Sequence, residues 1–300
     1  MDVTIVIPVR NESARISACL KAVYAQITSM RFEVMVIDSG STDDTVEKVK
    51  CFPNVRLIHQ TEMDFGHGRT RNLGAREARG SWVVFLNGDA EPEGTYWLEN
   101  LVRPLRRDRT LAGVFSRHLP YPGCPLYMQR DLKRAFPPDD SIVIRTWLPR
   151  RPTHFSTVSA AVPRSLWKEH SFRDTIAIAE DQEWERRVLA AGFPILYEPR
   201  SRVFHSHHYP PSRMFRQKRD VSRSTPRFSN AWAAWLLGLP LCLGGGIVRI
   251  CGDLPYVIGN LEGSAGFIIE FGRAVAARVS SFCGRFVGWL QAARGGAKRI

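Results

Sequence analysis

The 300-residue chain contains six cysteines but no C-x-x-C pair. Cysteines scattered in this way exclude a cysteine-rich zinc module and argue against a disulfide framework, so a reducing compartment is the simplest expectation. No internal repeat or low-complexity tract occurs, and no Lys or Arg precedes the first apolar run, residues 3–7, which is therefore not predicted to be a signal peptide. The glycine-rich signatures GxGxxG and GxxxxGK[ST] are also missing, which argues against a dinucleotide-binding fingerprint and a P-loop.

Acidic residues are in deficit, with 29 Asp and Glu against 42 Lys and Arg, so the formal net charge is +13. This excess predicts a polyanionic partner, such as a phosphate-bearing substrate or an anionic lipid surface. No aromatic stacking signature or groove-reading helix accompanies the basic residues. We therefore expect no nucleic-acid partner.

Short apolar runs alternate with helical patterns along the first two hundred residues. The expected strands are residues 3–7, 32–37, 54–58 and 82–86, and a helix is expected at 70–79. This alternation predicts an α/β fold with a mostly parallel sheet and helices on both faces. Polar groups directly follow three of the strands, at 8–12, 38–43 and 87–91. Because ligands of such sheets bind beyond the carboxyl ends of the strands, these groups are expected to form one site.

The C-terminal ninety residues have a different pattern. Residues 228–248 contain no charged side chain and are flanked by arginines, and about 20 apolar residues can span a bilayer. Residues 264–290 mix aromatic and aliphatic residues with arginines, a pattern typical of a basic amphipathic helix at a membrane interface. We expect domain 1–212 to be followed by a helical extension, 213–300, that associates with a membrane; a helical lid on the domain is the alternative.

Two segments contain residues suited to a nucleotide. Asp38 opens the turn DSGSTDDT, where its side chain either forms an Asx-type turn or accepts hydrogen bonds from a base or ribose. In the segment DFGHGRTRNLGA, 64–75, Arg69 and Arg71 follow two glycines. Arginine is suited to bidentate contact with phosphate oxygens. A diphosphate-facing loop is therefore favoured over a solvated basic loop.

Acidic residues and histidines supply the remaining candidates. Asp89 follows a strand, and Mg²⁺ or Mn²⁺ can neutralise a diphosphate while bound by few protein carboxylates. Glu180 and Asp181 either complement a helix dipole or provide a general base for an attacking hydroxyl. A short loop after a strand contains three histidines that are candidates to complete the metal shell, His205, His207 and His208.

Six motifs, taken together and in order, resemble family 2 glycosyltransferases, the inverting, nucleotide-sugar-dependent enzymes of GT-A fold. They are VIPVRNE (6–12), VIDSGSTDDT (36–45), FGHGRTRN (65–72), FLNGDAEP (85–92), AEDQEW (179–184) and PRSRVFHSHHY (199–209). The phenylalanine–histidine–glycine block and the motif ending in Asp-Ala-x-Pro are most similar to the rhamnosyltransferase-like branch.

The resemblance implies a role for each matching residue. Asp181 is the expected catalytic base, with Glu180 as an outside candidate. The expected nucleotide-sugar-binding residues are Pro8, Val9, Arg10, Glu12, Asp38, Ser39, Arg69, Arg71, Asn72, Asn87 and Gly88. Mg²⁺ or Mn²⁺ is expected at the metal-binding residues Asp89, His205 and His207. Trp184 is expected to shape the acceptor site, and Asn87, in place of the first carboxylate of D-x-D, is expected to weaken metal binding.

The resemblance also implies a function. The enzyme would transfer a sugar from a nucleoside-diphosphate sugar, such as dTDP-rhamnose, to a hydroxyl of a glycan or lipid-linked acceptor in cell-surface polysaccharide or glycolipid synthesis. The basic, apolar extension predicts a location at the cytoplasmic face of the cell membrane, peripheral or with one inserted segment. Two alternatives remain open, a sugar-phosphate nucleotidyltransferase and a membrane-binding module that lost activity with Asn87.

Overall fold

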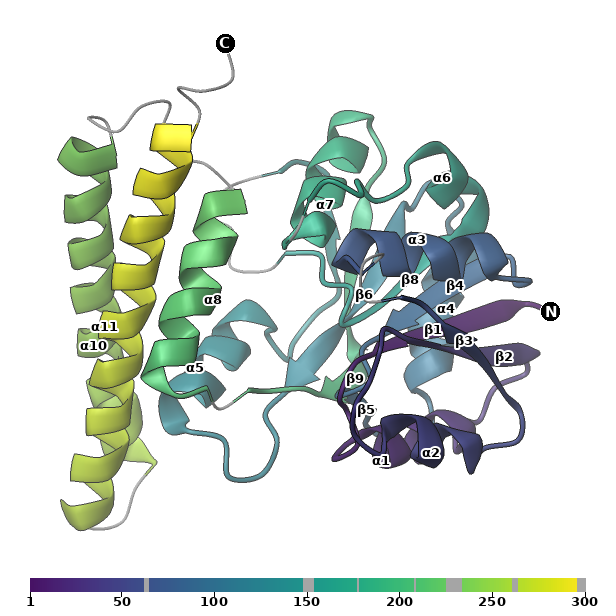
Figure 1. The fold of residues 1–300 in the computed structure, drawn as a ribbon, viewed down its shortest axis with the longest axis horizontal. Helices are drawn as coiled ribbons and strands as arrows, with labels where there is room; N and C mark the ends of the chain where they lie inside the picture. The colour runs from purple at the N-terminus through teal and green to yellow at the C-terminus, as the bar shows by residue number, and fades with distance from the viewer. Residues whose placement is uncertain are drawn as a thin grey trace. The chain divides into compact units, whose positions relative to one another are not determined.

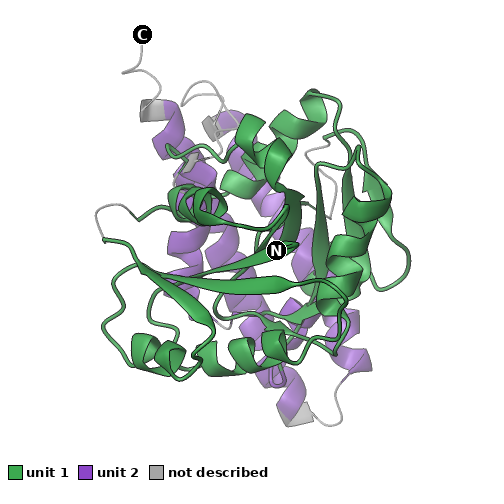
Figure 2. Cartoon of the chain, turned by 90° about the vertical axis from the view of Figure 1, so that its right-hand side faces the viewer, with its two compact units in different colours: residues 1–121, 132–205 green, residues 122–131, 206–300 purple. Residues whose placement is uncertain are grey.

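The computed structural model describes residues 1–61, 65–147, 154–176, 178–207, 209–224, 234–260 and 264–295. It divides into two compact units, drawn in different colours in Figure 2. Unit 1 comprises residues 1–121 and 132–205, and unit 2 comprises 122–131 and 206–300. The division near the C-terminus falls between residues 205 and 206, where the sequence suggested 212 and 213, and a short earlier segment joins unit 2.

Helices and strands alternate through the first two hundred residues (Figure 1). In chain order they are β1 (Val3–Val9), α1 (Ile16–Tyr24), β2 (Phe32–Asp38), α2 (Thr45–Lys50), β3 (Val55–His59), α3 (His67–Glu77), β4 (Trp82–Leu86), β5 (Glu91–Pro92), α4 (Trp97–Arg107), β6 (Gly113–Leu119), α5 (Leu126–Ala135), β7 (Ile142–Ile144), β8 (Ser159–Pro163), α6 (Arg164–Glu169), α7 (Glu180–Ala190) and β9 (Ile195–Phe204). Each of the four predicted strands is present, and the helix expected at 70–79 forms three residues earlier, over 67–77.

The strands form one mixed sheet in the order β3-β2-β1-β4-β8-β6-β9-β5, with β7 also paired to β9. The first four strands are mutually parallel, as predicted. β8 then runs antiparallel to both β4 and β6, and β6 pairs parallel with β9. The expected α/β fold is confirmed, with antiparallel pairing added beyond β4.

Two apolar layers enclose the sheet because side chains alternate along each strand. On β1, Ile5 and Ile7 face a cluster that also contains the buried faces of α1 and α4, whereas Val6 faces a cluster built on α3, α6 and α7. The helices therefore cover both faces, as Figure 1 shows. Every apolar residue of β1, β2 and β4 except Pro8, Phe32 and Trp82 is buried, which is the pattern of central parallel strands.

Unit 2 is helical in its described part. After α8 (Pro211–Ser224), a π-helical turn η2 (Ala234–Gly238) leads into α10 (Leu239–Gly259), which is followed by α11 (Ser264–Gly295). Glycines let the helices approach closely: a Cβ on Gly284 or Gly288 would collide with the backbone of α8, and one on Gly246 would lie 2.7 Å from the Phe282 ring. A buried ionic network adds polar contacts, because Arg278 donates at 2.8 Å to both carboxylate oxygens of the fully buried Asp253.

The expected apolar run begins outside the described residues, which omit 225–233, and continues into a long helical segment. One helix in the described part of the chain, Leu236–Gly259, is long and apolar enough to cross a membrane, with a mean hydropathy of 1.4 over its best window. Large aliphatic side chains are exposed along η2 and α10 and at the start of α11: Leu236, Leu237, Leu241, Leu243, Ile247, Val248, Leu254, Ile258, Ile268 and Ile269.

Candidate active site

The polar groups predicted to converge do follow adjacent strands at one edge of the sheet. β1 and β2 are in parallel register with Val9 opposite Asp38, and β4 pairs with the other side of β1. Gly88 tightens this edge, because a Cβ on it would lie 2.6 Å from Cγ1 of Val9 and 3.5 Å from the Pro8 carbonyl. The turn after β4 therefore packs directly on the end of β1. Pro8, Val9, Asp38 and Gly88 are brought together as expected.

Asp38 is buried and organises the turn after β2. Its carboxylate accepts hydrogen bonds from the backbone N–H groups of Gly40 and Ser41 at 3.3 and 3.2 Å. Ser39 is fully buried and donates its N–H to the Val9 carbonyl at 3.0 Å. The Asx-type turn is therefore real, and the second expected role of Asp38, contact with a nucleotide, stays a prediction.

The loop after β1 is held against this turn. The backbone N–H of Glu12 donates to Oγ1 of Thr45 at 2.8 Å, and the side-chain oxygen of Asn11 accepts from the Thr42 N–H at 2.8 Å. Asn11 adopts a left-handed conformation, φ 56°, which asparagine tolerates better than most residues. The exposed Arg10 places its guanidinium 5.9 Å from the Phe65 ring centre, so the loops after β1 and β3 meet.

The two arginines of the basic segment have different surroundings. Both lie on α3, but Arg69 is exposed whereas Arg71 is buried. Nη1 of Arg71 donates to Oε1 of Glu180 at 2.7 Å, and Nη2 donates to Oδ1 of Asn87 at 2.9 Å. Arg69 is thus available to a diphosphate, while the guanidinium of Arg71 is bound to protein groups.

The acidic pair occupies the first turn of α7. Glu180 is buried and bound to Arg71, whereas Asp181 is half-buried and accepts a hydrogen bond from the Thr157 N–H at 3.4 Å. Burial and, secondarily, the neighbouring carboxylate of Glu180 raise the pKa of Asp181 to about 7. Ala179, directly before the helix, has φ 68°, a left-handed conformation that costs a residue with a Cβ about 1–2 kcal/mol. A carboxyl group with a pKa near neutrality is suited to general-base chemistry.

Asp89 and His205 meet through a strand pair. β5 and β9 are antiparallel with Glu91 opposite Phe204, which brings Nε2 of His205 to 3.7 Å from Oδ2 of Asp89. The His205 N–H donates to the Leu119 carbonyl at 2.9 Å, which fixes the loop that carries the ring. His207 lies two residues further along the chain, at the start of unit 2, and His208 is outside the described residues.

Two residues that the sequence did not single out complete the surroundings of Asp89 and His205. His118 on β6 is buried, stacks on Phe136 at 3.9 Å between ring centres, and lies 5.5 Å from the ring of His205. Burial and the neighbouring His205 lower the pKa of His118 well below its usual range. Tyr121 donates its hydroxyl to the Asp89 carbonyl at 3.1 Å. Neither residue belongs to a local motif; only the pairing of β6 with β9 places them here.

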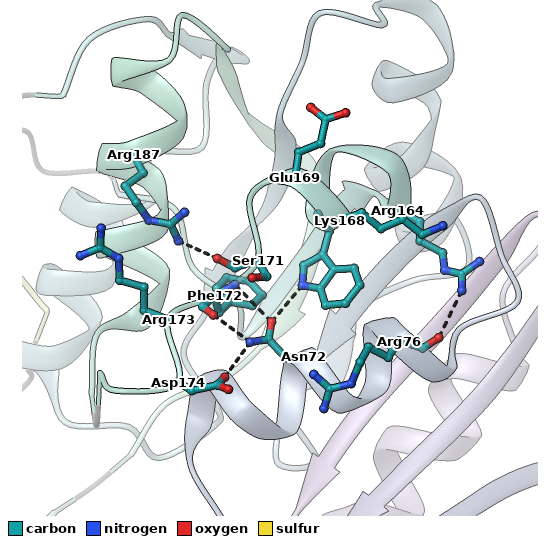
Figure 3. A pocket seen from close by; sticks show the side chains of 11 residues that line it. Asn72, Arg76, Arg164, Lys168, Glu169, Ser171, Phe172, Arg173, Asp174 and Arg187 are labelled. Atoms are coloured by element: carbon teal, nitrogen blue, oxygen red, sulfur yellow. Dashed lines mark hydrogen bonds between the residues drawn. The ribbon is translucent and has the colours of Figure 1, made fainter.

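Asn72 performs a structural task. Its side-chain nitrogen donates at 2.8 Å to both the Phe172 carbonyl and Asp174, and its oxygen accepts from the Trp167 indole and the Phe172 N–H (Figure 3). Asn72 lines a basic cavity of about 630 Å³ together with Arg76, Lys168 and other residues of α3, α6 and α7. These four bonds use the hydrogen-bonding capacity of the amide. The expected contact of Asn72 with the donor is therefore replaced by a clamp on the segment before α7.

Trp184 lies in the core. Its side chain is fully buried, packs against the rings of Phe155 and Phe172, and donates its indole N–H to the His170 carbonyl at 2.6 Å. A side chain in this position does not reach an acceptor directly, and the expected role of Trp184 in shaping the acceptor site stays a prediction. Any influence of Trp184 on an acceptor is exerted through the packing of α7.

Comparison of the sequence with known proteins identifies close similarities. Residues 4–168 match the family described as glycosyl transferase family 2. The chain is 31% identical over 227 residues to the O-antigen chain rhamnosyltransferase WbaN of Salmonella anatum, covering 73% of this chain and 70% of that protein. It is 29% identical over 232 residues to the O-antigen chain rhamnosyltransferase RfbN of Salmonella typhimurium, covering 74% and 71%.

Solved structures share the fold. The mannosyltransferase PcManGT from Pyrobaculum calidifontis, determined with GDP-Man and Mn²⁺, has a TM-score of 0.59 at 20% identity and covers 98% of this chain and 86% of its own. Residues 1–349 of TarS from S. aureus have a TM-score of 0.55 at 18% identity, covering 98% and 92%. At these identities the likeness establishes the architecture.

Proposed function

Since the chain belongs to glycosyl transferase family 2, we propose that it transfers a sugar, with inversion, from a nucleoside-diphosphate sugar to a hydroxyl of a cell-surface glycan or its lipid-linked precursor. Membership of the family decides against the nucleotidyltransferase that the sequence alone left open. The names of the two Salmonella relatives support a rhamnosyl donor such as dTDP-rhamnose and an acceptor related to O-antigen.

The observation that carries the mechanism is the difference between the two adjacent carboxylates of α7. Glu180 is bound to Arg71, whereas Asp181 is partly exposed with a pKa near 7. We assign Asp181 as the base that takes the proton from the acceptor hydroxyl. The hydroxyl oxygen then bonds to the anomeric carbon as the bond from that carbon to the diphosphate oxygen breaks, on the opposite face of the sugar. Positioning of the two substrates supplies much of the remaining rate enhancement.

A divalent cation, Mg²⁺ or Mn²⁺, fits Asp89 and His205. Two ligands of one such ion, each about 2.1 Å from it, lie about 3–4 Å apart, and the 3.7 Å between Asp89 and His205 meets this requirement. His207 is two residues from His205 and is the proposed third ligand. When bound, the ion neutralises charge on the departing diphosphate. The exposed Arg69 is proposed to donate to the same diphosphate.

A panel of nucleotide sugars, dTDP-rhamnose included, tests this proposal through release of nucleoside diphosphate in the presence of Mn²⁺ and an acceptor extract. We expect turnover of at least one donor. Asp181→Asn should retain donor binding and lose transfer. Absence of turnover with every donor would favour the inactive membrane-binding module, and near wild-type transfer by Asp181→Asn would refute the assignment of the base.

We also propose that unit 2 holds the enzyme at the cytoplasmic face of the membrane as a peripheral protein. Residues 206–300 contain 13 Lys and Arg against four Asp and Glu, which suits an anionic lipid surface, and α10 presents exposed aliphatic side chains. Asp253, in the second half of this helix, is fully buried in ion pairs with Arg130 and Arg278. A helix so bound along one side by charged partners is suited to lie in the interface rather than to cross alone.

Sedimentation with lipid vesicles tests this location. We expect binding to vesicles with 30% phosphatidylglycerol that weakens with salt, and little binding to phosphatidylcholine. Ile247→Asp should reduce binding at least tenfold, whereas the matched change Gln217→Asp, on the exposed side of α8, should have little effect. Binding to neither vesicle would refute the proposal. Retention in the membrane after alkaline carbonate extraction would show a spanning segment instead.

A further inference from the structure

Asn87 stands where the first carboxylate of a metal-binding D-x-D motif was expected, and its side chain has a protein partner. The amide oxygen Oδ1 accepts a hydrogen bond from Nη2 of Arg71 at 2.9 Å. The backbone N–H of Asn87 donates to the Val158 carbonyl at 2.9 Å, and its carbonyl accepts from the Ala90 N–H at 3.0 Å. The backbone of Asn87 is thus fixed between Val158, directly before β8, and the turn that carries Asp89. Its amide oxygen is bound to the guanidinium of Arg71.

Arg71 connects three elements that are distant in the sequence. From α3 its guanidinium reaches Asn87 after β4 and Glu180 at the start of α7, and Nη1 also donates to the His67 carbonyl at 3.2 Å. The Arg71 and Glu180 side chains are each only 5% exposed. Of the other two N–H donors of Arg71, Nε–H is buried and has no hydrogen-bond partner among the described residues. Protein groups therefore hold Arg71 through three of its five N–H donors.

The charges of Arg71 and Glu180 balance each other, and a neutral residue at position 87 adds no further charge to this pair. Arg71 contributes one positive charge and Glu180 one negative charge, both removed from water. An aspartate at position 87, which is half-buried, would add a second carboxylate with a single cation to share. A charge that is partly removed from water without a partner of its own is destabilising. The amide of asparagine keeps the acceptor oxygen and the shape without the charge.

We propose that Asn87 is a positioning residue for the catalytic base. Its neutral amide oxygen fixes the side chain of Arg71, and Arg71 in turn holds Glu180. Glu180 precedes Asp181 in the first turn of α7, so the position of this turn, and of the base in it, depends on Asn87. This inference rests on the proposed function for the role of Asp181. Thr157 supports the same turn, since its side chain lies 3.5 Å from Glu180 and its N–H donates to Asp181. Asparagine in place of the first aspartate of D-x-D therefore helps to position the catalytic base, and residue 87 is not a metal ligand.

Mn²⁺ binding, followed by electron paramagnetic resonance without donor or acceptor, tests whether residue 87 is a metal ligand. Asn87→Ala removes the amide oxygen without changing the charge, and we expect the dissociation constant for Mn²⁺ to change less than threefold. Asp89→Asn is the comparison and should weaken binding at least tenfold. A tenfold or greater loss in Asn87→Ala would overturn the inference. An unchanged affinity in Asp89→Asn would instead count against the proposed metal site.

A double-mutant cycle that exchanges the charges of residues 87 and 180 tests whether Asn87 acts as the neutral partner of Arg71. Asn87→Asp should lower the melting temperature by at least 5 °C, and Glu180→Gln should lower it too, because each leaves the charges around Arg71 unequal. The double variant has one carboxylate and one amide around Arg71 again, so its loss should be clearly smaller than the sum of the two single losses. Asn54→Asp, at an exposed position before β3, controls for an added negative charge. Additive losses, including a double variant that does not fold, would overturn the inference.

The pH dependence of kcat gives a readout that mere destabilisation would not move. The charged groups that act on Asp181 are Glu180 from its own helix, which raises its pKa, and Arg71 from α3, which lowers it. Asn87→Asp should therefore move the rise of kcat to higher pH by about one unit, and the same midpoint as wild type would overturn the link to the base. If wild type releases no diphosphate from any donor, the proposed function fails, while the Mn²⁺ and melting results still decide whether Asn87 binds Arg71 or the metal.

Discussion

Replacement of the proposed base by its neutral isostere, Asp181→Asn, should abolish transfer and yet stabilise the protein at neutral to alkaline pH. The folded structure raises the pKa of Asp181 from 3.8 to about 7. Between these two values the folded state holds a proton that the unfolded chain releases. The resulting stability is fully present below about pH 4 and is lost as the pH rises through 7. Asparagine does not ionise, so the variant avoids this loss.

The magnitude follows from the size of the shift. Each pKa unit corresponds to about 1.4 kcal/mol, which gives a ceiling of about 4 kcal/mol for the full shift. Because Asp181 is only half-buried, solvent screening reduces this, and we expect the variant to gain about 1–2 kcal/mol at pH 8. That corresponds to a melting temperature about 3–6 °C higher. At pH 5 the gain should be clearly smaller.

Urea unfolding of both proteins at pH 5 and pH 8 measures the difference directly, and a transfer assay accompanies it. Transfer should fall by at least about 100-fold, the usual contribution of a general base. In the wild type, kcat should rise with pH up to about 7, because the base must be deprotonated. An equal stability difference at the two pH values, or a less stable variant at pH 8, would refute the reasoning from burial.

Three further substitutions probe the geometry around the site. Asn72→Ala should lower the free energy of unfolding by about 2–4 kcal/mol in urea titrations, since four internal hydrogen bonds are lost; a loss below 1 kcal/mol would contradict the clamp. Gly88→Ala places a Cβ 2.6 Å from Val9 and should cost about 1–3 kcal/mol in the same titration, with reduced transfer as the turn moves; wild-type stability would show that the edge accommodates it. Ala179→Gly removes the strain of a left-handed residue and should raise stability by about 0.5–1 kcal/mol, whereas a loss would show that the methyl group is needed for packing.

Much of the fold could be predicted from local pattern. The alternation of apolar runs with helical periodicity located the first four strands, and the order of polar groups after them indicated which edge of the sheet carries the site. The apolar face expected for the first helix, Ile16, Cys19, Leu20 and Val23, is the face that is buried. These features depend on side chains only a few residues apart, so the sequence shows them directly.

Residue roles within the site depended on longer distances. Arg69 and Arg71 are indistinguishable in a motif, but helix α3 turns one outward and the other onto Glu180, 109 residues away. Asn72 bonds across about 100 residues to the segment before α7, and Trp184, three residues after Asp181, faces the core instead of a ligand. A motif records which residue types are present but not which way each one faces.

The sequence by itself determined the family, the parallel half of the sheet and the candidates for the base and the metal ligands, because each is encoded in a short contiguous pattern. Only the tertiary structure decided that β5 and β9 bring Asp89 to His205, and that the amide oxygen of Asn87 accepts a hydrogen bond from a buried arginine. Burial and charge balance depend on which distant groups share one volume, and that is settled only when the chain has folded.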